Sequence, residues 1–247
     1  MFRLTKLLTS LILFVFLFSC KNDKPATSQS ETFANLELNR GDLLLCGDPN
    51  FGEVSFSLSC RYDLREKFNL GLTLIHSFEY AEAEKVFVSI LDQDSECLMA
   101  YWATAMSILN HPLSFKQNPE SLKRGEELLK VAKKLSPNNE REKDYIDAVS
   151  IYFEDWQNLD TQSRKLNYED KMEELYKKYP DDVETAVFYS LAVLASAELN
   201  DKTYTNQKKS GKILEELFKK YPNHQGIVFA IHLEHLKNEE KEDDLSN

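Results

Sequence analysis

Apolar residues recur every three to four positions along most of the chain after residue 60, which is the spacing of amphipathic helices. Ile146, Val149 and Phe153 form one such series, and Val187 and Leu191 belong to another. The pattern predicts nine helices, at Tyr62–Ser77, Tyr80–Asp92, Cys97–Asn110, Glu120–Leu135, Glu140–Trp156, Arg164–Lys178, Asp182–Leu199, Gln207–Lys220 and Gln225–Leu236.

The segment before the first helix has a different pattern. Val54, Phe56 and Leu58 alternate with serines, which is the period of an extended chain. No second stretch of this kind offers it a partner strand. We therefore expect an extended lead-in to the helices rather than part of a sheet.

The first 19 residues have the features of a secretory signal. A short basic start is followed by the apolar run LLTSLILFVFLF and a small residue, Ser19. The run is shorter than the roughly 20 residues that a membrane-spanning helix needs. Leu17-Phe18-Ser19-Cys20 resembles the lipobox of bacterial lipoproteins, which implies that Cys20 carries the lipid and begins the mature chain. Lys21, in place of Asp, favours the outer membrane by analogy with known lipoprotein sorting.

Four domains follow from these patterns. Residues 1–19 are the signal peptide, and residues 20–59 are a lipid-anchored tether and the extended lead-in. The tether through Arg40 is polar and without apolar periodicity, so we expect it to be flexible. Residues 60–238 form the helical domain, and residues 239–247 form an acidic tail.

Composition supports a helical protein and makes one class of partner, nucleic acid, unexpected. The 247 residues include only 7 glycines and 7 prolines, which are few for a protein of many strands and turns. The net charge is −11, and loss of the signal, which holds two bases and no acid, makes the rest more acidic. An acidic surface repels phosphate backbones, so nucleic acid is not an expected partner. Membrane attachment must then come from the anchor.

One short sequence motif recurs about every 42 residues. Lys-Lys-Tyr-Pro or a close variant ends at Pro137, Pro180 and Pro222, and a Glu-Glu-Leu segment precedes each. A period of this size is typical of helical repeat arrays, in which each unit packs against its neighbours.

The first unit resembles the tetratricopeptide repeat. Leu70-Gly71, Leu74, Ala83 and Phe87 match positions of the pattern W-x2-L-G-x2-Y, A-x3-F, P. Gly71 and Ala83 would be small because two antiparallel helices cross closely there. The sequence therefore predicts an all-α fold, an α-solenoid of about four such helix pairs and a terminal helix. Cys97–Trp102 and Asn223–Gly226 are similar to segments of a group of uncharacterised secreted tetratricopeptide proteins, for which the family name carries no established activity.

The resemblance implies a binding surface. First helices of this class line a concave groove, where the chain would bind a protein or peptide. The groove candidates come from the first two units: Arg65, Phe68, Leu72, His76, Met99, Trp102, Met106 and Asn110. The alternative interpretation is that these residues pack against the next helix layer or the lead-in.

The resemblance also bears on the cysteines. Successive first helices begin side by side in this class, which makes Cys60 and Cys97 the favoured disulfide pair. Cys46 with Cys60 is the rival pairing. Secretion would place either disulfide in an oxidising compartment.

No catalytic set of residues stands out, and we expect no metal or cofactor. His76 and His111 fall at similar places in two helices and would be neighbours, but two ligands do not make a zinc site. The first hypothesis is a non-enzymatic, lipid-anchored scaffold. A glycan-binding or other small-ligand lipoprotein is the second, and it predicts exposed aromatic side chains such as Tyr101 and Trp102. A metal or hydrolytic protein using His76 and His111 is the third.

Overall fold

The computed structural model describes residues 36–45, 52–110, 118–198, 200–228 and 230–231. Within these residues the regular secondary structure is helical, and none of them forms a β-strand. After a short 3-10 turn, η1 (Tyr62–Leu64), come α2 (Arg65–His76), α3 (Tyr80–Leu91), α4 (Leu98–Leu109), α5 (Pro119–Ala132), α6 (Glu140–Phe153), α7 (Thr161–Lys178), α8 (Val183–Ser196) and α9 (Thr205–Phe218). A further helix starts at Gln225.

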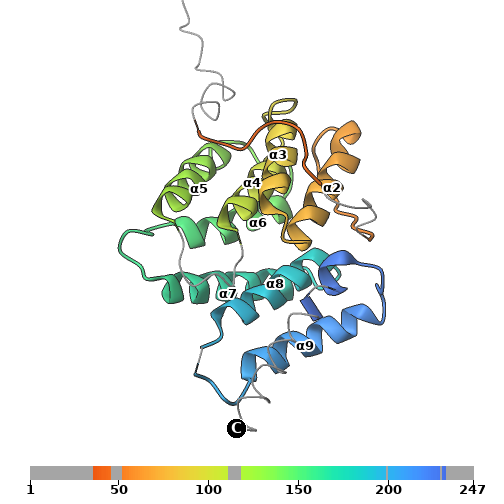
Figure 1. Cartoon of the computed structure of the whole chain (residues 1–247), viewed down its shortest axis with the longest axis vertical. Coiled ribbons are helices and arrows are strands. Elements are labelled where there is room, and N and C mark those ends of the chain that lie inside the picture. The colour runs from red at the N-terminus through yellow and green to blue at the C-terminus, as the bar shows by residue number, and fades with distance from the viewer. Residues whose placement is uncertain (1–35, 46–51, 111–117, 199, 229, 232–247) are drawn as a thin grey trace, which may run out of the picture.

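The helices pack mainly with their neighbours in the sequence, as in a helical repeat array (Figure 1). α2 packs on α3, α4 on α5, α6 on α7 and α8 on α9, and α4 also contacts α2 and α6. The all-α array predicted from the sequence is confirmed. Cys20, Cys46, His111 and the acidic tail lie outside the described residues.

Two glycines lie where helices cross closely, and the one at Gly71 lies between paired helices, as the repeat pattern predicted. A Cβ atom on Gly71 in α2 would lie 2.6 Å from Cζ of Phe87 in α3. A Cβ atom on Gly125 in α5 would lie 2.1 Å from Cε1 of Phe153 in α6. Both distances are far inside van der Waals contact, so neither position accepts a side chain without repacking.

Helix starts follow from side-chain caps. Asn118, Asn139, Asp160 and Asp182 each accept a hydrogen bond from a backbone N–H in the first turn of the helix that follows. Such a cap satisfies a donor that has no partner within the helix and stabilises the helix by about 1 kcal/mol. These four caps explain why α5 to α8 begin within three residues of the predicted starts.

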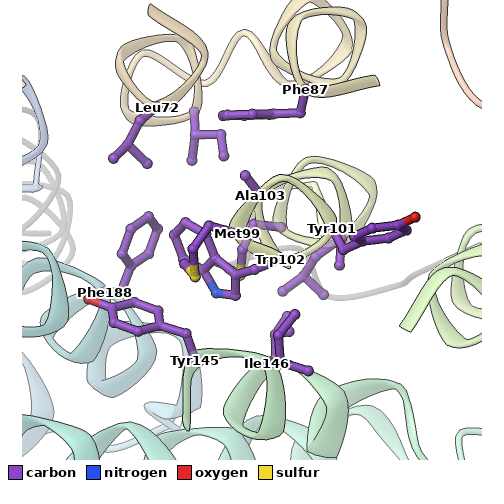
Figure 2. Packing of buried hydrophobic residues seen from close by; sticks show 14 of the residues in the cluster. Leu72, Phe87, Met99, Tyr101, Trp102, Ala103, Tyr145, Ile146 and Phe188 are labelled. Atoms are coloured by element: carbon purple, nitrogen blue, oxygen red, sulfur yellow. The ribbon is translucent and has the colours of Figure 1, made fainter. Parts of the chain in front are cut away.

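The core is centred on α4, all of whose residues are buried. Its Trp102 packs edge-on against Tyr145 of α6 and Phe188 of α8, with ring centroids 5.1 Å away in both cases (Figure 2). Aromatic side chains bury large areas and pair favourably in edge-to-face geometry. α4 is therefore the helix that joins the first and last units of the array.

Residues 36–45 are docked on the array, which corrects the prediction of flexibility for residues 36–40 alone, because the earlier part of the predicted tether lies outside the described residues. The backbone N–H and side-chain amide of Asn39 donate to the two carboxylate oxygens of Glu84, at 2.9 and 2.8 Å. The backbone N–H of Leu44 donates to Glu82, and Leu38 is buried. Burial raises the pKa of Glu84, against the bonds from Asn39 and the charge of Arg124. Sequence pattern missed this contact because its acceptors lie on α3, some 40 residues away.

Cys60 and Cys97 form a disulfide with a Cα–Cα distance of 5.0 Å, so the favoured pairing is present and the rival pairing with Cys46 is not. The bond ties the end of the lead-in to the start of α4. It indicates an oxidising location outside the cytoplasm. None of the described helices has the length and apolar character to cross a membrane.

Candidate functional site

The lead-in segment, which we define as residues 52–59, crosses the start of several helices as an extended chain. Phe56 is buried, Val54 and Leu58 are half-buried, and the three serines between and after them are exposed. The alternation predicted from the sequence is therefore real, and its apolar side packs on helices instead of on a strand. We call the surface beneath it, formed by α2, α4 and α6, the inner face.

Phe56 is the anchor of the lead-in segment and is 1% exposed. Its ring lies nearly parallel to Trp102, with centroids 5.9 Å apart, and close to Phe68 and Tyr145, at 5.3 and 5.6 Å. The guanidinium of Arg141 lies over the Phe56 ring, 4.4 Å from its centroid. The inner face thus forms an aromatic socket closed by a cation, which favours an aromatic side chain over an aliphatic one.

Hydrogen bonds to the backbone hold the lead-in segment at the anchor and after it. The N–H of Phe56 donates to Oδ1 of Asn69 at 3.1 Å, and Arg141 donates to the carbonyl of Ser57 at 2.8 Å. The N–H of Ser59 donates to Glu142 at 2.7 Å. These bonds engage main-chain groups, so they suit many sequences in the same extended conformation.

The lead-in segment also meets the last described part of the chain. The N–H of Glu53 donates to the carbonyl of Asn223 at 3.0 Å. A Cβ atom on Gly52, which has a positive φ of 81°, would lie 2.9 Å from that carbonyl oxygen. Glycine is therefore favoured at residue 52, where the backbone must turn in a tight space.

The candidate groove residues are placed mostly in the interior, which corrects the expectation of an open groove. Six of them are at most 5% exposed: Phe68, Leu72, His76, Met99, Trp102 and Met106. The lead-in segment and neighbouring helices cover them. Arg65 is half-buried beside Tyr62, and Asn110 is exposed at the end of α4. The sequence identified the inner face but not its occupant, although packing against the lead-in was the stated alternative.

The aromatic residues expected on the surface of a glycan-binding protein are also interior. Tyr101 is fully buried and Trp102 is 1% exposed. They contribute to the core and present no platform to a sugar. The structure therefore contradicts the feature on which the glycan hypothesis depended.

A buried cluster joins three distant parts of the chain. Glu184 in the first turn of α8 contacts His76, at the end of α2, and His224, before the terminal helix. Nε2 of His76 lies 2.8 Å from one carboxylate oxygen, and Nε2 of His224 lies 2.9 Å from the other. The histidine rings are 5.6 Å apart, and His76 stacks on Phe188. The cluster therefore connects α2, α8 and the terminal helix.

Glu184 is ionised in this cluster. Burial raises its pKa, but the charge of His76 and the hydrogen bonds from both histidines outweigh burial and lower the pKa to about 2. An ionised carboxylate can only accept, so each Nε2 carries a proton and donates. Both Nδ1 atoms are buried without a hydrogen-bond partner.

The cluster was not predicted, because its members lie 108 and 40 residues apart in the sequence. We expected His76 to lie beside His111, which is outside the described residues. In sequence, Asn223–Gly226 is similar to a segment of secreted tetratricopeptide proteins. The structure shows why a glycine is needed at the end of this segment. A Cβ atom on Gly226 would lie 2.7 Å from Nδ1 of His76, so only glycine lets the terminal helix approach this ring. No group of three or more histidine, cysteine or acidic residues in the described parts of the chain is arranged to hold a metal ion.

Two hollows adjoin these features. A small hollow of about 20 Å³ lies beside His76, among Met106, Tyr168 and Phe188. This volume is enough for a water molecule and too small for a sugar or nucleotide. An open cleft of about 460 Å³ runs beside the lead-in segment, between it and the connection from α7 to α8. The cleft is the larger of these two hollows.

Comparison with known proteins returned no match to a protein family, to a curated protein or to a solved structure.

Proposed function

We propose that this protein is a non-enzymatic binding scaffold of the bacterial cell envelope, which captures an extended peptide segment of a partner protein on its inner face. The signal and the lipobox-like sequence support a lipid anchor at Cys20, and the residue after it favours the outer membrane. The 42-residue period and the close helix crossings at Gly71 and Gly125 support a tetratricopeptide-like array.

One observation carries the proposal: the inner face already holds an extended segment. The lead-in segment is bound through one buried aromatic residue and several main-chain hydrogen bonds. This combination is how peptide-binding surfaces obtain affinity from the backbone and specificity from a side-chain pocket. A partner segment with an aromatic residue in the same register would make the same contacts in place of the chain's own residues.

The test uses the mature full chain and a fluorescently labelled peptide with the sequence of residues 52–59. Phe56→Ala removes the internal competitor's anchor, so this variant should bind the peptide at least tenfold more tightly than the wild-type chain does. The same peptide with alanine in place of phenylalanine should not bind. Ser55→Ala, at an exposed position of the lead-in segment, is the matched control and should behave as wild type. Fluorescence anisotropy measures the binding of the natural peptide to wild type, Phe56→Ala and Ser55→Ala, and the binding of the alanine-substituted peptide.

Circular dichroism shows whether Phe56→Ala retains its helices. If a folded Phe56→Ala variant does not bind the peptide, the proposal is wrong. If the variant does not fold, a peptide with a photoreactive phenylalanine at the anchor position is applied to wild-type protein in excess. Crosslinks to Trp102 or Tyr145 would support the proposal, and their absence at saturating peptide would overturn it.

A further inference from the structure

The cleft beside the lead-in segment is poorly filled by the chain's own residues. Ser55 and Ser57 flank the anchor Phe56, and both line the open cleft of about 460 Å³. Each serine is exposed and contributes only a hydroxymethyl group. The lead-in segment therefore uses its apolar side for binding and leaves the space on its other side empty of large side chains.

The far wall of this cleft has a distinct chemistry. Tyr179, Pro180 and Val183 supply apolar surface between α7 and the start of α8. The Lys178 ammonium lies 5.4 Å from the ring centroid of Tyr179. Hydrogen bonds to Asp144 and Glu140 raise the pKa of Lys178, so it remains charged over the physiological range. Asp181 adds an exposed carboxylate at the rim.

Aromatic side chains match this wall better than aliphatic or acidic ones. A ring can stack on Tyr179 and Pro180 and can also attract the nearby ammonium of Lys178 through its π face. A phenolic hydroxyl can in addition donate to a carboxylate at the rim. A tyrosine buries about 150–250 Å², which a serine cannot approach.

The lead-in segment and a partner segment would compete for the inner face. The lead-in segment is part of the same chain, so its effective concentration at the inner face is of millimolar order. To displace the lead-in segment despite this high effective concentration, a partner segment must make contacts that the lead-in segment lacks. The cleft offers such contacts beside an otherwise shared binding mode.

We infer that the cleft is a specificity site for a partner segment that carries aromatic side chains, tyrosine above all, at the two positions flanking its buried aromatic anchor. This inference rests on the proposed function. The recognised pattern is then aromatic–aromatic–aromatic in an extended conformation, with the central ring in the socket of Phe68, Trp102 and Tyr145 and the outer rings on the cleft wall.

The experiment compares two labelled peptides on the folded Phe56→Ala full chain: EVSFSLS, the natural sequence, and EVYFYLS. We expect the tyrosine peptide to bind at least tenfold more tightly. Tyr179→Ala, added to the same protein, should abolish this advantage and leave binding of the natural peptide within twofold. Tyr221→Ala, which removes an exposed tyrosine that does not line the cleft, is the matched control and should preserve the advantage.

The outcomes separate the two proposals. Equal binding of both peptides overturns the specificity site and leaves the proposed function standing, whereas binding of neither peptide overturns the proposed function itself. A second measurement needs no free peptide. Ser57→Tyr in the otherwise unchanged chain should fill the cleft from within and raise the melting temperature by roughly 2–4 °C, the size of a 1 kcal/mol gain for a domain of this length. An unchanged or lower melting temperature contradicts the inference.

Discussion

At the scale of single residues, the most informative result is that Trp102 belongs to the core rather than to an open surface. Its ring is 1% exposed and packs on Phe56, Tyr145 and Phe188. We expect Trp102→Ala to lower the free energy of unfolding by about 3–5 kcal/mol, the usual cost of removing a large buried aromatic residue. Urea denaturation measures this value. Trp156→Ala, at a half-buried tryptophan, is the control and should cost less than half as much. A folded Trp102→Ala protein of unchanged stability would contradict the core assignment.

Glu184 gives a prediction about pH. Its pKa is lowered from 4.5 to about 2, so the folded state favours the ionised form. The stabilisation is therefore complete above pH 4.5 and is lost as the pH falls towards 2. Glu184→Gln should cost about 3 kcal/mol at pH 7. The difference between wild type and variant should shrink between pH 4.5 and 2 in urea denaturation series.

The control for this series is Glu120→Gln, at an exposed position of α5. Its difference from wild type should stay near zero at every pH. A Glu184→Gln difference that is the same at pH 7 and at pH 2.5 would show that ionisation of Glu184 does not stabilise the cluster.

At the scale of elements, helices were predictable and their non-local partners were not. α3 begins at Tyr80 and α6 begins at Glu140, the residues that the apolar spacing predicted. The side chain of Asn139 caps α6, whereas the start of α3 has no side-chain cap. The lead-in segment was recognised as extended from its alternation. Its position on the inner face was not predicted, because Asn69, Arg141 and Glu142 bind it from two helices more than 70 residues apart. Amphipathic pattern identifies which side of a helix is covered but not what covers it.

The disulfide links Cys60, directly after the lead-in segment, to Cys97, directly before α4, across 37 residues. Loop closure of this length restricts the unfolded chain and contributes about 4 kcal/mol to stability in the chain-entropy model. We expect Cys97→Ser to lower the free energy of unfolding by roughly that amount, measured by urea denaturation without reductant. Cys46→Ser should have no comparable effect. A loss below 1 kcal/mol for Cys97→Ser would show that the crosslink is not a major source of stability.

At the scale of the whole molecule, two segments that flank the array, residues 52–59 and the helix that starts at Gln225, close its inner side. The lead-in segment covers the inner face, and the terminal helix approaches His76 through Gly226. The sequence predicted an array with an accessible concave surface. The array is present, and the surface is occupied. Under the proposed function, a partner segment would bind by exchange, with release of the lead-in segment as the partner enters.

The most direct test of this account is hydrogen–deuterium exchange of the full mature protein, followed by mass spectrometry, without and with saturating EVYFYLS peptide. The account predicts that the amides of Phe56 and Ser59 are protected in the free protein, because both donate hydrogen bonds to buried or half-buried side chains of the array. It predicts that the peptide abolishes this protection while α4 and α6 stay protected. Fast exchange of the lead-in segment in the free protein, or protection that the peptide does not change, would contradict the account.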